Sequence, residues 1–166
     1  VELAADLGRI PLSLTLPLSG GAQEAVSAIF EAADGHGVTL AIHAEREIDT
    51  AAQALDRWSY DGVGLGLDPA TLLLQGQDAV AAAQKLGPRL TSARLSDADG
   101  DLGQRTAVGR GDLDVSSYRV SVDLATHRTG PVVLDLRSLQ DPLASSREAD
   151  KAWQDAAFSL GPHPPR

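Results

Sequence analysis

Apolar runs of strand length alternate with segments of helical periodicity along almost the whole chain. The runs cover residues 10–16, 38–42, 63–67, 90–95 and 132–136, and they are largely apolar on both faces. Buried parallel strands have this character, and strands that alternate with helices form parallel sheets. The sequence therefore predicts an α/β fold built from parallel β/α repeats.

Helix signals fill the intervals between these runs. Helices are expected over residues 21–34, 49–58, 78–86, 115–127 and 141–160, and residues 1–7 resemble a helix end that Gly8 terminates. Asp78 and Asp141 are the expected N-caps, and Pro142 suits the first helical position. Residues 96–114 are rich in Gly and Asp and are expected to form a long polar loop. We expect one domain over residues 1–160 and a loose tail at 161–166.

A doubly wound open sheet and a β/α barrel both satisfy this pattern. The glycine-rich fingerprint of dinucleotide-binding sheets does not match, because Gly64 and Gly66 lie inside an expected strand and not in a turn before a helix. The pattern alone leaves the two architectures open.

Charge and composition exclude several classes of function. The net charge is −9, which argues against a nucleic acid or an anionic membrane as partner, because both need clustered Lys and Arg. Hydrophobic residues make up 43% of the chain but aromatic residues only 4%, so the core must consist of Ala, Leu and Val. The chain contains no Cys, which excludes disulfides and thiolate metal sites and fits a cytoplasmic protein.

Five segments occur in an order that resembles the xylose isomerase-like TIM barrels, the sugar phosphate isomerase/epimerase family. They are HGVTLAIHAE, DGVGLGLDPATLLLQGQD, LTSARLSDADGD, VGRGDLDVSSY and GPVVLDLRSLQDP. The resemblance implies the last five β/α units of an (β/α)8 barrel. It also implies a sugar or a related hydroxy-carbonyl compound as substrate.

The resemblance further implies a divalent metal at the C-terminal ends of the strands, held in the family by Glu, Asp, His and Glu. The corresponding residues here are His43, Asp68, Arg94 and Asp135, and Thr71 stands where the family has a substrate-contacting His. If activity is retained, the resemblance assigns the catalytic roles to His43, Asp68 and Asp135.

Arg94 is the substitution that changes the chemistry most, since a guanidinium has no lone pair for a metal and stays charged. We expect Arg94 to pair with Asp68 or Asp135 and the site to be free of metal. A weaker alternative keeps Mn, Mg or Zn on His43, Asp68 and Asp135, because His plus two carboxylates is a workable ligand set.

Four residues are candidate substrate contacts: Arg94, Thr71, Asp97 and Arg105. For Arg94 a structural ion pair is the competing role, and for Asp97 the competing role is to cap the turn that follows it. Arg105 lies near a glycine-rich loop, where it could meet an anion or be ordinary surface charge.

A complete barrel needs eight strands and about 250 residues, so five strands leave two apolar edges exposed. We expect a homo-oligomer or completion by an N-terminal part. The function that the resemblance implies first is a sugar phosphate isomerase or epimerase with reduced or lost metal-dependent activity. The alternative is a non-catalytic barrel that acts as a binding or scaffold module.

Overall fold

The computed structural model of the protein describes residues 1–15, 23–43, 48–57, 62–125 and 132–158. Its helices are α1 (Glu2–Asp6), α2 (Gln23–His36), α3 (Ile48–Arg57), α4 (Pro69–Leu73), α5 (Ala79–Leu86), α6 (Val115–Ala125) and α7 (Pro142–Phe158), with a 3-10 turn η1 (Gly87–Arg89) after α5. Its strands are β1 (Leu12–Leu14), β2 (Leu40–His43), β3 (Val63–Leu67), β4 (Leu90–Leu95), β5 (Asp97–Asp99), β6 (Gln104–Thr106) and β7 (Val133–Leu134).

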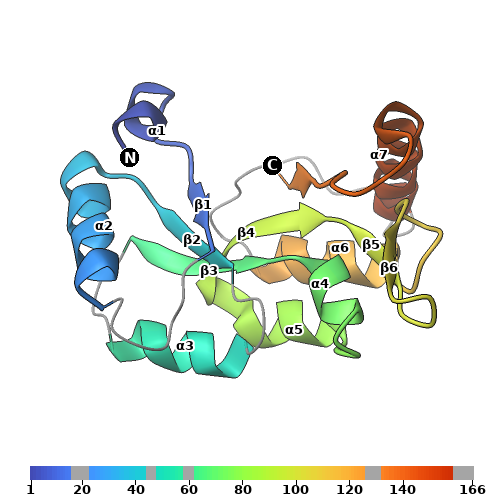
Figure 1. Ribbon diagram of the computed structural model, residues 1–166, viewed down its shortest axis with the longest axis horizontal. Helices are drawn as coiled ribbons and strands as arrows, with labels where there is room; N and C mark the ends of the chain where they lie inside the picture. Colours follow the sequence, from blue (N-terminus) through green and yellow to red (C-terminus); the bar gives the residue numbers. More distant parts are fainter. Residues whose placement is uncertain (16–22, 44–47, 58–61, 126–131, 159–166) are drawn as a thin grey trace.

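Five of the strands form one parallel sheet in the order β1-β2-β3-β4-β7. Figure 1 shows the sheet curling, with α2, α3, α5 and α6 along its outer side. The curl brings Ser13 of β1 to within 3.3 Å of Ser92 of β4, Oγ to Oγ, although two strands separate them in the sheet. The fold is therefore a curled half-barrel of parallel β/α units, as the sequence predicts, and not a doubly wound sheet.

Short aliphatic side chains fill the core between the sheet and the helices. Fully buried residues include Leu40 and Ile42 from β2 and Leu65 and Leu67 from β3. Tyr118 of α6 is also fully buried, and its hydroxyl donates a hydrogen bond of 2.9 Å to the carbonyl oxygen of Arg94. This bond fixes the backbone of β4 at the end of the strand where Arg94 lies.

Three helix boundaries follow directly from their capping residues. Asp78 caps α5 by accepting bonds from the amides of Val80 and Ala81, and Gly87 ends that helix with a positive φ of 48°. Asp141 accepts a bond from the amide of Ala144 at the start of α7. Some expected positions lie outside the described residues. They are the helix ends at residues 21, 22, 58, 126, 127, 159 and 160 and the tail at 161–166.

The expected loop at residues 96–114 was only partly right. It contains the antiparallel hairpin β5–β6, in which Ala98 pairs with Arg105. The sequence did not predict this hairpin because its strands carry no apolar run. Side chains that bond the backbone hold the hairpin instead; the Asp99 carboxylate, for example, accepts a hydrogen bond from the amide of Leu102. The helix α4 was also missed, and β1 and β7 are shorter than expected.

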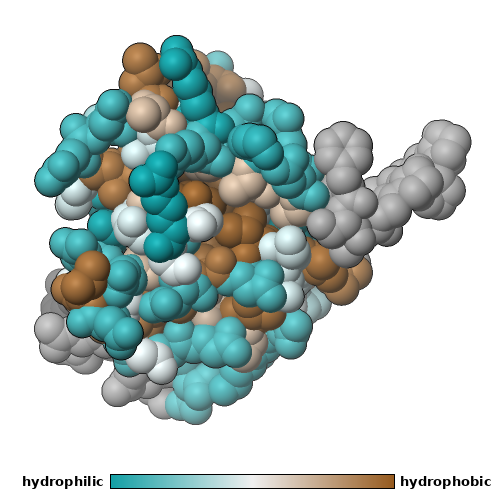
Figure 2. Space-filling view, turned by 90° about the vertical axis from the view of Figure 1, so that its right-hand side faces the viewer, coloured by the Kyte–Doolittle hydropathy of each residue, from teal (hydrophilic) through white to brown (hydrophobic). Residues whose placement is uncertain are grey.

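Figure 2 views the side on which α7 and β6 lie in Figure 1 and shows a largely hydrophilic face with hydrophobic residues gathered near its middle. Elsewhere Leu3 and Leu124 are 70% and 73% exposed. Apolar surface therefore remains uncovered in the described part of the chain. None of the helices described there combines the length and the apolar character that crossing a membrane requires.

Candidate functional site

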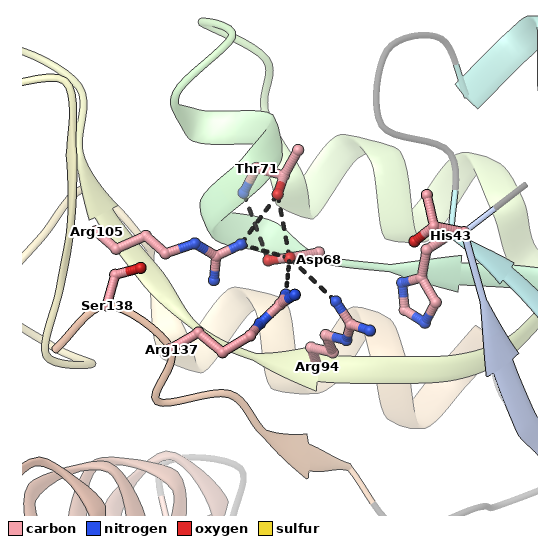
Figure 3. Close-up of a pocket in the computed structure, with 8 residues that line it drawn as sticks. His43, Asp68, Thr71, Arg94, Arg105, Arg137 and Ser138 are labelled. Atoms are coloured by element: carbon pink, nitrogen blue, oxygen red, sulfur yellow. Dashed lines mark hydrogen bonds and ion pairs between the residues drawn. The ribbon is translucent and has the colours of Figure 1, made fainter. Parts of the chain in front are cut away.

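The C-terminal ends of the parallel strands bring the predicted site residues together. His43 is the last residue of β2, Asp68 directly follows β3, Arg94 is next to last in β4, and Asp135 directly follows β7. Because the strands are parallel and neighbouring, these positions share one edge of the sheet. Figure 3 shows Asp68 near the middle of this edge, with three guanidinium groups pointing toward it and His43 to one side.

Asp68 is the centre of the network. Its Oδ1 accepts a 2.7 Å bond from the hydroxyl of Ser96, and its Oδ2 accepts a 2.6 Å bond from Nη2 of Arg105. Nη1 of Arg94 and Nη2 of Arg137 each lie 3.4 Å from the same Oδ2. Burial would raise the pKa of Asp68, but the bonds from Ser96 and Arg105 outweigh it and hold the pKa below its usual value.

Thr71 joins this network from the first turn of α4. Its hydroxyl donates to Oδ2 of Asp68 at 3.1 Å and accepts from Nη2 of Arg105 at 3.1 Å. Its amide lies 3.4 Å from Oδ1 of Asp68, which is the N-cap of α4. Asp68 therefore has a structural role as a helix cap as well as a place in the pocket.

Asp135 forms a two-pronged pair with Arg137. Nε of Arg137 lies 2.8 Å from Oδ1 and Nη2 lies 2.5 Å from Oδ2. Arg94 and Arg105 reach the same Oδ2 at 3.7 Å and 3.4 Å. Burial acts to raise the pKa of Asp135, but the bonds and charge of Arg137 lower it to about 2.

Arg105 reaches the site from the hairpin, and Asp97 holds that hairpin in place. The Asp97 carboxylate accepts bonds from four backbone amides, those of Ala98, Gly109, Gly111 and Leu113, at 2.8 to 3.0 Å. Its side chain is buried and is not among the pocket-lining residues. These bonds support the competing role of Asp97, the organisation of the turn, whereas its contact with substrate stays a prediction.

The glycine-rich turn packs closely on Asp97 as well. A Cβ on Gly111 would lie 2.4 Å from both the Ala98 carbonyl oxygen and Oδ1 of Asp97. Only glycine fits there without displacing the carboxylate. Burial raises the pKa of Asp97, although the four amide bonds oppose that effect.

His43 lies in a polar layer inside the curl of the sheet. Its Nε2 is 3.3 Å from the hydroxyl of Ser13, which in turn lies 3.3 Å from that of Ser92. Gly66 of the neighbouring strand makes room for the ring, because a Cβ there would lie 2.2 Å from Nε2. Burial lowers the pKa of His43 to about 4, and the charge of Arg94 acts in the same direction. The imidazole is therefore neutral at neutral pH.

The pocket at this edge has a volume of about 220 Å³. It is lined by Thr15, His43, Asp68, Thr71, Arg94, Arg105, Arg137 and Ser138. Asp135 lies behind its arginine partners, with a side chain only 6% exposed. The side chain of Arg137 is 62% exposed, and Ser138 next to it has a positive φ of 69°, a strained conformation for a residue other than glycine. The outer rim of the pocket is therefore formed by Arg137 and Ser138.

The residues at these strand ends do not fit the divalent metal that the fold resemblance implies. The Oδ2 atoms of both Asp68 and Asp135 already face the same three guanidinium groups. Guanidinium nitrogens offer no lone pair, and their positive charge repels a cation. Among the residues that the structure describes, no three His, Cys, Asp or Glu side chains gather as a metal-ligand group, and Glu45 and Glu47 lie outside that part. The alternative ligand set of His43, Asp68 and Asp135 is thus not assembled.

The sequence predicted several of the residues that meet at this pocket but did not indicate the others. Asp68, Arg94 and Asp135 pair as expected, and Thr71 and Arg105 line the same pocket. Arg137, Ser96, Ser138 and Thr15 were not foreseen. Arg137 directly follows the end of a predicted strand, and this position was the one available signal for it.

Comparison with known proteins identifies the fold. No protein-family model matches the chain, and no curated protein is significantly similar to it in sequence. Among solved structures, a xylose isomerase domain protein from Planctomyces limnophilus has a TM-score of 0.69 at 19% identity, covering 96% of this chain and 61% of that one. The IolI protein with a bound zinc atom has a TM-score of 0.65 at 16% identity, covering 96% of this chain and 65% of that one.

A third similar structure is D-psicose 3-epimerase, determined in the presence of D-fructose. Its TM-score is 0.68 at 15% identity, with 97% of this chain and 68% of that one covered. The chain spans about two thirds of the length of these structures. Its fold is that of the xylose isomerase-like TIM barrels.

Proposed function

We propose that this chain is a non-catalytic member of its fold that binds a small sugar-like compound in the pocket at the strand ends. The similar structures include sugar epimerases, which supports a sugar-like ligand. The observation that carries the proposal is the contact of three arginines with both carboxylates, Asp68 and Asp135. These contacts occupy the groups that a metal-dependent isomerase would need for its cation.

The same contacts make the carboxylates poor bases. A base that removes a proton from carbon works best with a pKa near the working pH. Asp135 has a pKa of about 2 and Asp68 a lowered one, so both carboxylates hold protons only weakly. His43 is neutral, but its pKa of about 4 also makes it a weak base. Neither proton transfer nor metal polarisation is supported by these residues.

The competing function is a working isomerase or epimerase in which His43, Asp68 and Asp135 are catalytic. The position of these residues at neighbouring strand ends favours it. Proton–deuterium exchange separates the two functions. The full chain is incubated with a panel of ketoses in D2O, with and without Mn²⁺, and the carbon-bound protons are followed by NMR.

Our proposal predicts no exchange with any ketose under either condition. It also predicts that calorimetry detects binding of at least one sugar or sugar derivative and that Thr71→Val weakens this binding. Exchange that depends on Asp68 would contradict the proposal, and so would the absence of binding by every compound tested.

The remaining expectations stay predictions. They are a cytoplasmic location, a single domain over residues 1–160, and a homo-oligomer or completion by an N-terminal part. Light scattering tests the association: a monodisperse 17.3 kDa species would contradict a homo-oligomer.

A further inference from the structure

A second cavity, an open groove of about 700 Å³, lies beside α4 and shares no lining residue with the pocket at the strand ends. Its walls come from the end of α4 and the segment that leads into α5, from Gly100 in the turn of the hairpin, and from the residues that lead into α6. Helix α4 contacts both α5 and β5, and Figure 1 shows these elements next to one another. The groove is therefore a surface feature of its own.

Aliphatic side chains form one part of the lining of this groove. Leu113 is buried, Leu73 and Val80 are half-buried, and Leu74 beside them is 40% exposed. These side chains leave apolar surface open in the groove. A partner that covers this surface removes it from water, which favours binding.

Carboxylates form the charged part of the lining. Asp78, Asp112 and Asp114 line the groove, and none of the described residues that line it is Lys, Arg or His. In the part of the chain that the structure describes, none of the three carboxylates forms an ion pair. The groove therefore presents negative charge that is free to pair with a cation.

Two of these carboxylates keep an oxygen open. Asp78 accepts bonds from the amides that it caps only through Oδ1, and Asp112 accepts from the amide of Gly100 only through Oδ2. Their other oxygens accept no hydrogen bond from the described residues. A cationic group can therefore bind Asp78 and Asp112 without breaking the bonds that hold α5 and the hairpin.

We propose that this groove docks a protein partner through a segment in which Lys or Arg alternates with aliphatic residues. The ammonium or guanidinium groups pair with the open oxygens of Asp78 and Asp112, and the aliphatic side chains cover Leu74 and Val80. Specific binding sites commonly have volumes of about 300 to 1,000 Å³, and the groove falls in this range. This docking is independent of the function proposed for the pocket at the strand ends.

The chemistry of the groove disfavours the other occupants. Within the described residues the carboxylates do not gather as metal ligands do, so a metal ion does not match them. Nucleic acids and anionic membranes are repelled by the negative charge. A second copy of the chain brings a net charge of −9 and is repelled as well. A polyamine matches the charge but leaves the aliphatic surface uncovered.

Fluorescence anisotropy with the full chain and labelled synthetic peptides tests the inference. The probes are an octapeptide of alternating Leu and Lys and a nonapeptide of Leu-Leu-Lys repeats. Octapeptides of alternating Ser and Lys and of alternating Leu and Glu are the controls. We expect at least one Leu/Lys peptide to bind about tenfold or more tightly than both controls, and its affinity to fall as NaCl rises from about 50 to about 300 mM.

Two variants locate the binding in the groove. Asp78→Asn/Asp112→Asn removes two charges but keeps side-chain oxygens that accept from the same amides, and Asn caps a helix about as well as Asp. It should weaken the Leu/Lys peptide by about fivefold or more. Leu74→Ser, at an exposed position, should weaken it as well through lost apolar contact.

A matched control accounts for net charge. Asp34→Asn/Asp150→Asn removes the same charge from exposed positions on α2 and α7, outside the groove lining, and should bind the peptide as the unmodified chain does. Equal weakening by the two double variants would overturn the inference, because it would assign the binding to the overall charge of the chain.

Three other results would also overturn the inference. The first is the absence of binding by both Leu/Lys peptides. The second is displacement of the bound peptide by spermidine at the same concentration as the unlabelled peptide, since charge alone would then account for binding. The third is self-association of the unmodified chain that Asp78→Asn/Asp112→Asn abolishes, which would identify a second copy as the occupant.

Discussion

Arg105 lies against Asp68, with Nη2 2.6 Å from Oδ2, although the two residues are 37 positions apart in the chain. One comes from a polar hairpin and the other from the end of a buried strand. Their contact joins the hairpin to the barrel and places a positive charge where the fold resemblance implies a cation. The predictions below follow from this pair and from the groups around it.

Replacing Arg105 with Gln should lower the free energy of unfolding by about 2 kcal/mol, because it removes the shortest hydrogen bond to the buried carboxylate of Asp68. Arg94 and Arg137 remain near Asp68, so the loss should stay below that of a carboxylate with no partner. Urea unfolding measures this loss of free energy. Arg110→Gln, an exposed pair, should change stability by less than about 0.5 kcal/mol. Equal effects of the two substitutions would show that Arg105 does not stabilise Asp68.

Replacing Gly66 with Ala should destabilise the protein by about 1 to 3 kcal/mol, because the new Cβ would overlap the His43 ring. Adding His43→Ala should recover most of that loss, which a double-mutant cycle measures. Gly35→Ala is the control. Nothing lies within 4 Å of a Cβ at Gly35 in α2, so this change should stabilise the helix by about 1 kcal/mol. Additive effects of the Gly66 and His43 changes would contradict the packing.

His43 should make stability depend on pH in the mildly acidic range. Burial lowers its pKa from 6.5 in the unfolded chain to about 4 in the folded one. Between these values the unfolded chain binds more protons, so the contribution is complete above the unfolded pKa and is lost as the pH falls toward 4. The loss should reach about 3 kcal/mol. Urea unfolding at several pH values should show it in the unmodified chain but not in His43→Gln. The same loss in both proteins would assign it to other groups.

Replacing Asp97 with Asn should destabilise the protein by about 2 to 3 kcal/mol, since a neutral amide cannot accept from all four backbone donors around it. Because Asp97 organises the hairpin, the change should also weaken ligand binding through Arg105. Asp99→Asn is the matched control, as Asp99 accepts one exposed bond from Leu102. Urea unfolding and calorimetry measure the two effects. An Asp97→Asn protein as stable as the control would contradict the assigned role.

The regular part of the fold could be predicted because its signals are local. β3 and β4 have the bounds expected from their apolar runs, and Asp78 and Gly87 fixed the ends of α5. The site could be predicted in part for a topological reason. The ends of neighbouring parallel strands must meet, so Asp68, Arg94 and Asp135 were expected at one edge.

The rest depends on contacts between distant residues. The β5–β6 hairpin is anchored by Asp97, whose carboxylate accepts from an amide as far away as Leu113. Arg137 is exposed and lies in an irregular segment, where no periodicity marks it. Its Nη2 also lies 3.4 Å from Oδ2 of Asp68, 69 positions away in the chain, a contact that only the folded chain shows.

The central claim is that arginine side chains have taken the place of a metal ion at the strand ends. Titration of the unmodified chain with Mn²⁺, followed by calorimetry, tests it most directly. The account predicts no micromolar binding, and the same result for Asp68→Asn. Micromolar binding of Mn²⁺ that Asp68→Asn abolishes would contradict it.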